Sequence, residues 1–134
     1  KKGEVASIAF YDDYAHHPTE IEKTLAAVKC AIREKKLTVI FQPHRFSRVR
    51  DCIEDFGKVF EMADRVLVLD IYGAGEKPIA GINAELLVQK IQQSSTTDCS
   101  YITKEDLLKE LKAAMRPHDV VLTMGAGDVT RLYS

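Results

Sequence analysis

The sequence predicts an α/β fold with a mostly parallel sheet and helices on both of its faces. Short, continuously apolar runs alternate with longer segments in which apolar residues recur every three or four positions. The first pattern is typical of strands that are buried on both sides, and the second of helices that connect parallel strands. With 134 residues, of which 46% are hydrophobic and 29% charged, the chain has the size of one globular domain.

The first half of the chain contains two predicted strands and two predicted helices. Ser7–Tyr11 and Leu37–Phe41 are the apolar runs. The first helix is expected to begin at Pro18, because proline suits a first helical turn. A capping box formed by Thr19 and Glu22 would start it one residue later. The buried helical stripes are Ile21, Leu25, Val28 and Ile32 in the first helix, and Val49, Ile53, Phe56 and Phe60 in the second.

The second half repeats this alternation. Arg65–Leu69 and Val120–Met124 are further strands, and Ser94–Ser100 is interpreted as a polar connection. Asn83 and Thr103 are each expected to cap a helix, because their side chains can accept a hydrogen bond from the first turn. The stripes expected to face the core are Ala84, Leu87, Val88 and Ile91, and then Leu107, Leu108, Leu111 and Met115.

Composition and termini exclude several classes of protein. The net charge of −1 offers no basic surplus for nucleic acid. No apolar run approaches the roughly 18 residues that span a membrane, and there is no signal-peptide pattern, so the cytoplasm is the expected location. Cys30, Cys52 and Cys99 are odd in number and far apart, which favours buried free thiols over disulfides. Residues 1–134 start without methionine and end in an apparent helix start, so they are expected to be excised from a longer chain.

A polar cluster follows each predicted strand. These clusters are DDYAHHP, QPHRFSR, DIYGAGEKPIAG and GAGD, in chain order. Because the carboxyl ends of parallel strands meet at one edge of a sheet, and ligands of such sheets bind there, the four loops predict one composite site. No GxxxxGK[ST] phosphate loop is present, so the chain cannot hold a triphosphate in that way. In GAGD, glycine is interpreted as relieving crowding in a turn.

The first cluster allows three interpretations. Asp12, Asp13, His16 and His17 are carboxylate and imidazole groups of the kinds that bind metals. They could instead cap the following helix and bond local amides. Carboxylates at a strand end can also hold ribose hydroxyls.

The second cluster suits an anion. Arg45 and Arg48 lie three residues apart at a predicted helix start, so they share a face near amides that attract negative charge. Two guanidinium groups with free amides would bind a carboxylate or phosphate. Arg50 is expected to be solvated or paired with Glu54. The later loop Tyr72–Glu76 is either a flexible connection or a part of the site.

Together these segments resemble the carboxyl-terminal domain of the Mur ligases of peptidoglycan synthesis. The resemblance rests on DDYAHHPTEI, FQPHRFSRVRD, VLVLDIYGAGEKPIAGI and LTMGAGD, in this order, and covers nearly the whole chain. It implies a Rossmann-like, mostly parallel sheet of about six strands, and a three-domain ATP-dependent ligase of which residues 1–134 are the last domain. The second and third motifs favour the member that adds L-alanine to UDP-N-acetylmuramate over the related murein-peptide recycling ligase.

The resemblance also implies roles for single residues. Asp13, with Asp12, would contact the ribose of ATP, and the arginines would bind the carboxylate of L-alanine. His16 or His44 would take the proton of the ammonium group. The positions implied around L-alanine are Tyr14, His16, His44, Arg45 and Arg48.

ATP and Mg²⁺ are expected in the full-length enzyme, with none tightly bound to this domain, which is expected to be inactive alone. Its implied partners are L-alanine, ATP, UDP-N-acetylmuramate and the missing amino-terminal and central domains, without nucleic acid or membrane. A non-catalytic nucleotide- or anion-binding module and a metal phosphoesterase remain alternatives.

Overall fold

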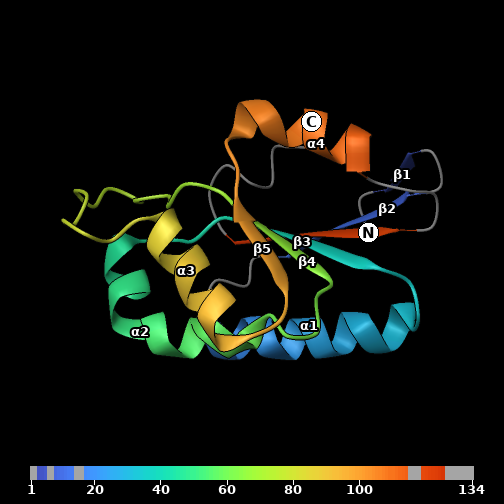
Figure 1. The fold of residues 1–134 in the computed structure, drawn as a ribbon, viewed down its shortest axis with the longest axis horizontal. Coiled ribbons are helices and arrows are strands. Elements are labelled where there is room, and N and C mark those ends of the chain that lie inside the picture. The colour runs from blue at the N-terminus through green and yellow to red at the C-terminus, as the bar shows by residue number, and fades with distance from the viewer. Residues whose placement is uncertain (1–2, 6–7, 14–16, 115–118, 126–134) are drawn as a thin grey trace.

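A computed structural model of the protein describes residues 3–5, 8–13, 17–114 and 119–125, and of residues 3–5, 8–13 and 114 it describes the backbone alone. These segments form one sheet of six strands with helices on both faces (Figure 1). The strands are β1 (Gly3–Val5), β2 (Ile8–Asp13), β3 (Leu37–Phe41), β4 (Arg65–Val68), β5 (Asp98–Tyr101) and β6 (Val120–Met124). The helices are α1 (Pro18–Ile32), α2 (Phe46–Val59), α3 (Ala84–Ser94) and α4 (Lys104–Ala114).

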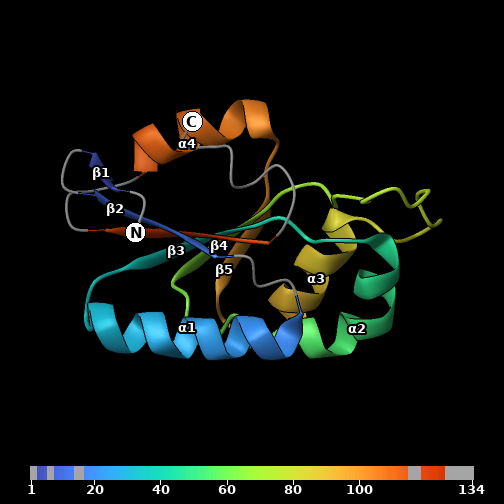
Figure 2. The same ribbon diagram turned by 180° about the vertical axis from the view of Figure 1, so that it is seen from behind.

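The strand order is β1-β2-β6-β3-β4-β5. β1 pairs with β2 in the antiparallel direction, and all other neighbours are parallel. The predicted mostly parallel α/β fold is therefore confirmed. The helices α1, α2 and α3 carry the chain from β2 towards β5, whereas α4 returns it to β6. Because such crossovers are right-handed, the reversal of direction places α4 on the opposite face (Figures 1 and 2).

The core has two layers because side chains alternate between the two faces of each strand. In β3, Val39 and Phe41 pack towards α1, α2 and α3, whereas Ile40 packs in the smaller cluster with Leu107 of α4. Leu108 is 53% exposed, so its predicted place in the core is wrong. A single helix on a sheet face buries a narrow stripe, here Leu107 and Leu111.

The helix starts follow local capping chemistry. α1 begins at Pro18 as predicted, and the Nδ1 of His17 accepts a hydrogen bond of 3.3 Å from the backbone N–H of Thr19. The predicted caps of Asn83 and Thr103 are confirmed. The side chain of Asn83 accepts a bond of 2.9 Å from the N–H of Leu86, and that of Thr103 accepts one of 3.3 Å from the N–H of Asp106.

Three predictions about local structure need correction. The connection proposed at Ser94–Ser100 contains strand β5, which lies at the edge of the sheet beside β4. The first strand extends beyond Tyr11, because β2 runs to Asp13. Of the cysteines, all three of which are free, Cys99 alone is buried, and this burial raises the pKa of its thiol to about 12.

Candidate functional site

The carboxyl ends of the parallel strands lie level at one edge of the sheet. Asp13 of β2 and Phe41 of β3 both pair with Met124 of β6, which lies between them. Phe41 in turn pairs with Val68 of β4, and Val68 with Tyr101 of β5. The carboxyl ends of β2 and β3 therefore lie about two strand spacings apart, roughly 10 Å. This register brings the carboxyl ends of β2, β3, β4 and β6 to one edge, as the sequence predicted.

The segment after β3 holds Arg45 in an unusual backbone conformation. Arg45 precedes α2 with φ 72° and ψ 131°, in the region that favours glycine. Its N–H donates a hydrogen bond of 2.7 Å to the carbonyl of Tyr72, and its own carbonyl accepts one of 3.3 Å from the N–H of Val49. Such a conformation costs free energy and persists only where its surroundings hold it in place.

The loop Tyr72–Glu76 is fixed by contacts with the start of α2. One oxygen of Glu76 accepts a hydrogen bond of 3.2 Å from the N–H of Ser47, and the other accepts one of 2.5 Å from the Ser47 hydroxyl. A side chain on Gly73 would meet the ring of Phe46 at 3.2 Å. The loop is therefore tied to the start of α2 at Gly73 and Glu76, which speaks against its interpretation as a flexible connection.

Glu76 also changes the expected chemistry of the helix start. The predicted anion site used free amides there, but the amide of Ser47 already binds the carboxylate of Glu76. The pKa of Glu76 is lowered, mainly by the hydrogen bond from the Ser47 hydroxyl, with Arg45 adding to the effect through its charge. An incoming anion would therefore depend on guanidinium groups more than on this amide.

The arginines of α2 differ in what engages them. Arg50 pairs with Asp51, with 2.8 Å between Nε and Oδ1, and Glu54 pairs with Lys90. Arg50 is thus exposed, as one of its two expectations had it, and the alternative pairing with Glu54 does not form. Arg45 is exposed and Arg48 half-buried, and within the described part of the chain neither forms an ion pair. Their guanidinium groups can thus bind an external anion.

His44 lies between these arginines and the loop after β4. Its ring stacks on that of Tyr72 with 5.7 Å between centroids and 19° between planes. The two residues also form an isolated bridge that extends the pairing of β3 and β4 beyond the sheet. His44 is half-buried at the same edge as Arg45.

The first cluster is only partly described. Asp12 and Asp13 lie at the end of β2, paired with Thr123 and Met124 through the backbone. Tyr14 and His16 lie outside the described residues. Among the residues that are described, no group of three or more potential metal ligands occurs. His17 caps α1, which agrees with the helix-capping interpretation for this residue.

A small polar cavity of about 260 Å³ opens at the same edge, between the ends of β3, β4 and β5. Beside it the Tyr101 hydroxyl donates a hydrogen bond of 2.8 Å to Asp70, and this bond raises the pKa of Tyr101 to about 12. Sequence reasoning missed Asp70 as a structural acceptor, because the strand that carries Tyr101 was not predicted. The cavity is lined by Gln42, Asp70, Ile71, Tyr72, Gly73, Lys104 and Glu105.

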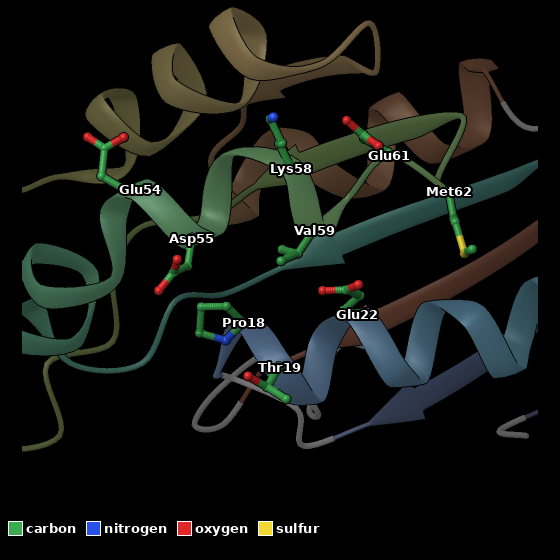
Figure 3. Close-up of a pocket in the computed structure, with 9 residues that line it drawn as sticks. All are labelled: Pro18, Thr19, Glu22, Glu54, Asp55, Lys58, Val59, Glu61 and Met62. Carbon is green, nitrogen blue, oxygen red and sulfur yellow. The ribbon is translucent and has the colours of Figure 1, made fainter.

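A larger groove of about 620 Å³ lies between α1 and the later part of α2 (Figure 3). None of the predicted site residues lines it. Four carboxylates and one lysine surround it, and this acidic lining would repel the anions that Arg45 attracts. The charged residues of the lining are Glu22, Glu54, Asp55, Lys58 and Glu61. Separately, no helix within the described residues is long and apolar enough to cross a membrane.

Comparison with known proteins gives a consistent result. Residues 1–127 match the family model described as Mur ligase, glutamate ligase domain. The chain is 48% identical over 133 residues to the UDP-N-acetylmuramate–L-alanine ligase of Protochlamydia amoebophila, covering 99% of this chain and 29% of that protein. It thus spans less than a third of that relative's length.

Solved structures agree on the fold. The UDP-N-acetylmuramate–alanine ligase of Thermotoga maritima matches with a TM-score of 0.69 and 28% identity, over 94% of this chain and 25% of that one. A murein peptide ligase of Psychrobacter arcticus matches with a TM-score of 0.76 over 97% of this chain and 28% of that one. Because the murein peptide ligase is only 22% identical, its similarity shows a shared fold and nothing further.

Proposed function

The chain belongs to the Mur ligase family, through its glutamate ligase domain, and from this membership we propose that it is the carboxyl-terminal domain of a ligase that joins L-alanine to UDP-N-acetylmuramate. The relative that is 48% identical carries that activity in its name. The structural observation that carries the proposal is Arg45, held exposed at the carboxyl edge of the sheet by the loop after β4.

In this proposal the chain is one part of a longer enzyme. The relative's length leaves about two thirds of the protein for parts that bind the UDP-sugar and the phosphates of ATP. This assignment agrees with the lack of a phosphate loop in the sequence. The 134 residues alone are then expected to have no ligase activity. The full enzyme would act in the cytoplasm.

The amino acid is proposed to bind at the start of α2. Arg45 and Arg48 would hold the carboxylate of L-alanine through charge-assisted hydrogen bonds. His44, with Tyr14 and His16 from the loop after β2, would surround the rest of the molecule. His16 or His44 would accept the ammonium proton, which leaves the amine free to attack.

The nucleotide is proposed to bind beside the amino acid. Asp12 and Asp13 end β2, two strands away from the arginine loop, where their carboxylates would accept hydrogen bonds from ribose hydroxyls. Because the sequence has no GxxxxGK[ST] phosphate loop, the phosphate chain of ATP and its Mg²⁺, which would activate the acceptor carboxylate, are assigned to the other parts of the enzyme.

This arrangement would let the domain contribute by orientation. A carboxylate fixed on two guanidinium groups leaves the amine of alanine with few accessible positions, which lowers the entropic part of the barrier to amide formation. Closure of the domain over the nucleotide would exclude water from the activated acyl group.

The substitution Arg45→Ala in the full-length protein tests this role. Loss of a charge-assisted carboxylate contact is expected to cost about 2 to 3 kcal/mol, seen as a rise of roughly 30- to 150-fold in the KM for L-alanine, with the KM for ATP unchanged. Arg50→Ala is the matched control, because Arg50 is exposed and already paired with Asp51. An effect on ATP alone, or an equal effect of both substitutions, would refute the assignment.

A further inference from the structure

We propose that Glu76 is a positioning residue for Arg45, which it holds ready for the substrate carboxylate through Ser47 and the loop Tyr72–Glu76. This inference rests on the proposed function, because it assumes that Arg45 binds the amino acid. Neither the family match nor the names of the relatives assign a role to Glu76.

Two connections join Glu76 to Arg45. The carboxylate of Glu76 binds both the N–H and the hydroxyl of Ser47, two residues after Arg45. On the other side, the carbonyl of Tyr72 accepts a hydrogen bond of 2.7 Å from the N–H of Arg45. The loop itself is closed by a bond of 3.0 Å from the N–H of Glu76 to the carbonyl of Gly73. The loop Tyr72–Glu76 thus binds the backbone of Arg45 itself and also Ser47, two residues further along the chain.

The backbone geometry explains why such a clamp is needed. Arg45 has φ 72°, which a residue with a side chain adopts rarely. Ala74 and Gly75 of the facing loop also have positive φ, at 52° and 91°. Both segments would relax towards other conformations if they were separated, because strained backbone persists only where neighbouring contacts fix it. The bonds of Glu76 to Ser47 join the two segments.

The position of Glu76 also decides where a substrate carboxylate can bind. The carboxylate of Glu76 accepts the hydrogen bond of the Ser47 N–H in the first turn of α2, and this N–H would otherwise attract a free anion. Its negative charge lies close enough to Arg45 to interact electrostatically with it. The incoming carboxylate is therefore directed to the guanidinium groups and away from the helix amide. Glu76 acts here without touching the substrate.

Steady-state kinetics of the full-length ligase carrying Glu76→Gln tests the proposal. The neutral amide side chain keeps the shape of Glu76 but loses the charge-assisted bonds to Ser47. We expect the KM for L-alanine to rise about tenfold, with kcat and the KM for ATP changed less than about twofold. Ser47→Ala, which removes one of the two donors, should give a smaller rise of the same kind. Glu61→Gln, at an exposed site beyond the carboxyl end of α2, whose amino end follows Arg45, should change nothing.

The double substitution Glu76→Gln with Arg45→Ala separates the possible outcomes. If Glu76 acts through Arg45, its replacement has no further effect on the KM for L-alanine once Arg45 is gone. An undiminished effect in that background would overturn the inference, as would a change of less than about twofold for both Glu76→Gln and Ser47→Ala alone. If Arg45→Ala itself leaves the KM for L-alanine unchanged, the proposed function has failed and the inference fails with it.

Discussion

Replacement of Gly125 by alanine probes a close approach between the residues that follow β3 and β6. Gly125 directly follows β6 and is buried, with φ 116°. A Cβ atom at this position would lie 2.2 Å from the carbonyl oxygen of Gln42 and 3.1 Å from its carbon. Gln42 cannot move away freely, because its N–H donates a hydrogen bond of 3.0 Å to the carbonyl of Met124. The interpretation of this glycine as relieving crowding is therefore confirmed.

Two contributions give the size of the effect. A side chain at a positive φ of this size costs about 1 to 3 kcal/mol, and overpacking against backbone costs about 1 to 3 kcal/mol more. Alanine restricts the unfolded chain relative to glycine, which returns about 0.4 to 1 kcal/mol. Gly125→Ala should therefore lower the free energy of unfolding by about 1 to 5.6 kcal/mol, a large fraction of the stability of a small domain.

Gly81→Ala separates the two contributions. Gly81 has φ 80°, and a Cβ atom there would meet nothing within 4 Å, so strain remains and the clash is absent. Its expected loss is about 1 kcal/mol. Urea denaturation of the 134-residue chain, with the slope checked for constancy, measures both values. A loss for Gly125→Ala no greater than that for Gly81→Ala would show that the close approach to Gln42 does not matter.

Two further predictions concern stability. Leu107→Ala should cost about 2 to 5 kcal/mol, whereas Leu108→Ala, on the same helix but 53% exposed, should cost less than about 0.5 kcal/mol in the same urea assay; equal losses would contradict the observed face of α4. The pKa of Asp64 is lowered: burial alone would raise it, but bonds from the N–H of Leu37 and from Lys29 outweigh burial. Because the folded pKa lies below the unfolded one, Asp64 stabilises the fold above its ordinary pKa and loses this effect as the pH falls through the lowered value. Asp64→Ala should therefore cost about 1 kcal/mol at pH 7 and clearly less once the pH has fallen below the lowered pKa of Asp64, and a loss that does not vary with pH would contradict this.

The sequence predicted the regular elements well where burial is continuous. Leu37–Phe41 and Val120–Met124 form strands with the predicted bounds, because both lie in the middle of the sheet and every residue of each is buried. β5 was missed because it is an edge strand in which only Cys99 is buried, so its composition resembles that of a loop. A periodic pattern of apolar residues in the sequence reflects which positions are buried, and an edge strand has few buried positions.

The gathering of the strand ends at one edge was predictable, but the contacts between the loops were not. That polar loops gather at one edge follows from the parallel strand direction. The bond between Glu76 and Ser47 joins residues 29 positions apart, and no spacing rule relates them. The strained φ of Arg45 likewise depends on the loop that holds it, and a residue type other than glycine gives no local signal of such a conformation.

The binding mode of L-alanine tests the central claim most directly. An experimental structure of the full-length protein with L-alanine and a nucleotide should place the amino-acid carboxylate within about 3 Å of the guanidinium of Arg45, with Glu76 still bound to Ser47. A carboxylate bound to the amide of Ser47 in place of Glu76, or bound away from the start of α2, would contradict the account.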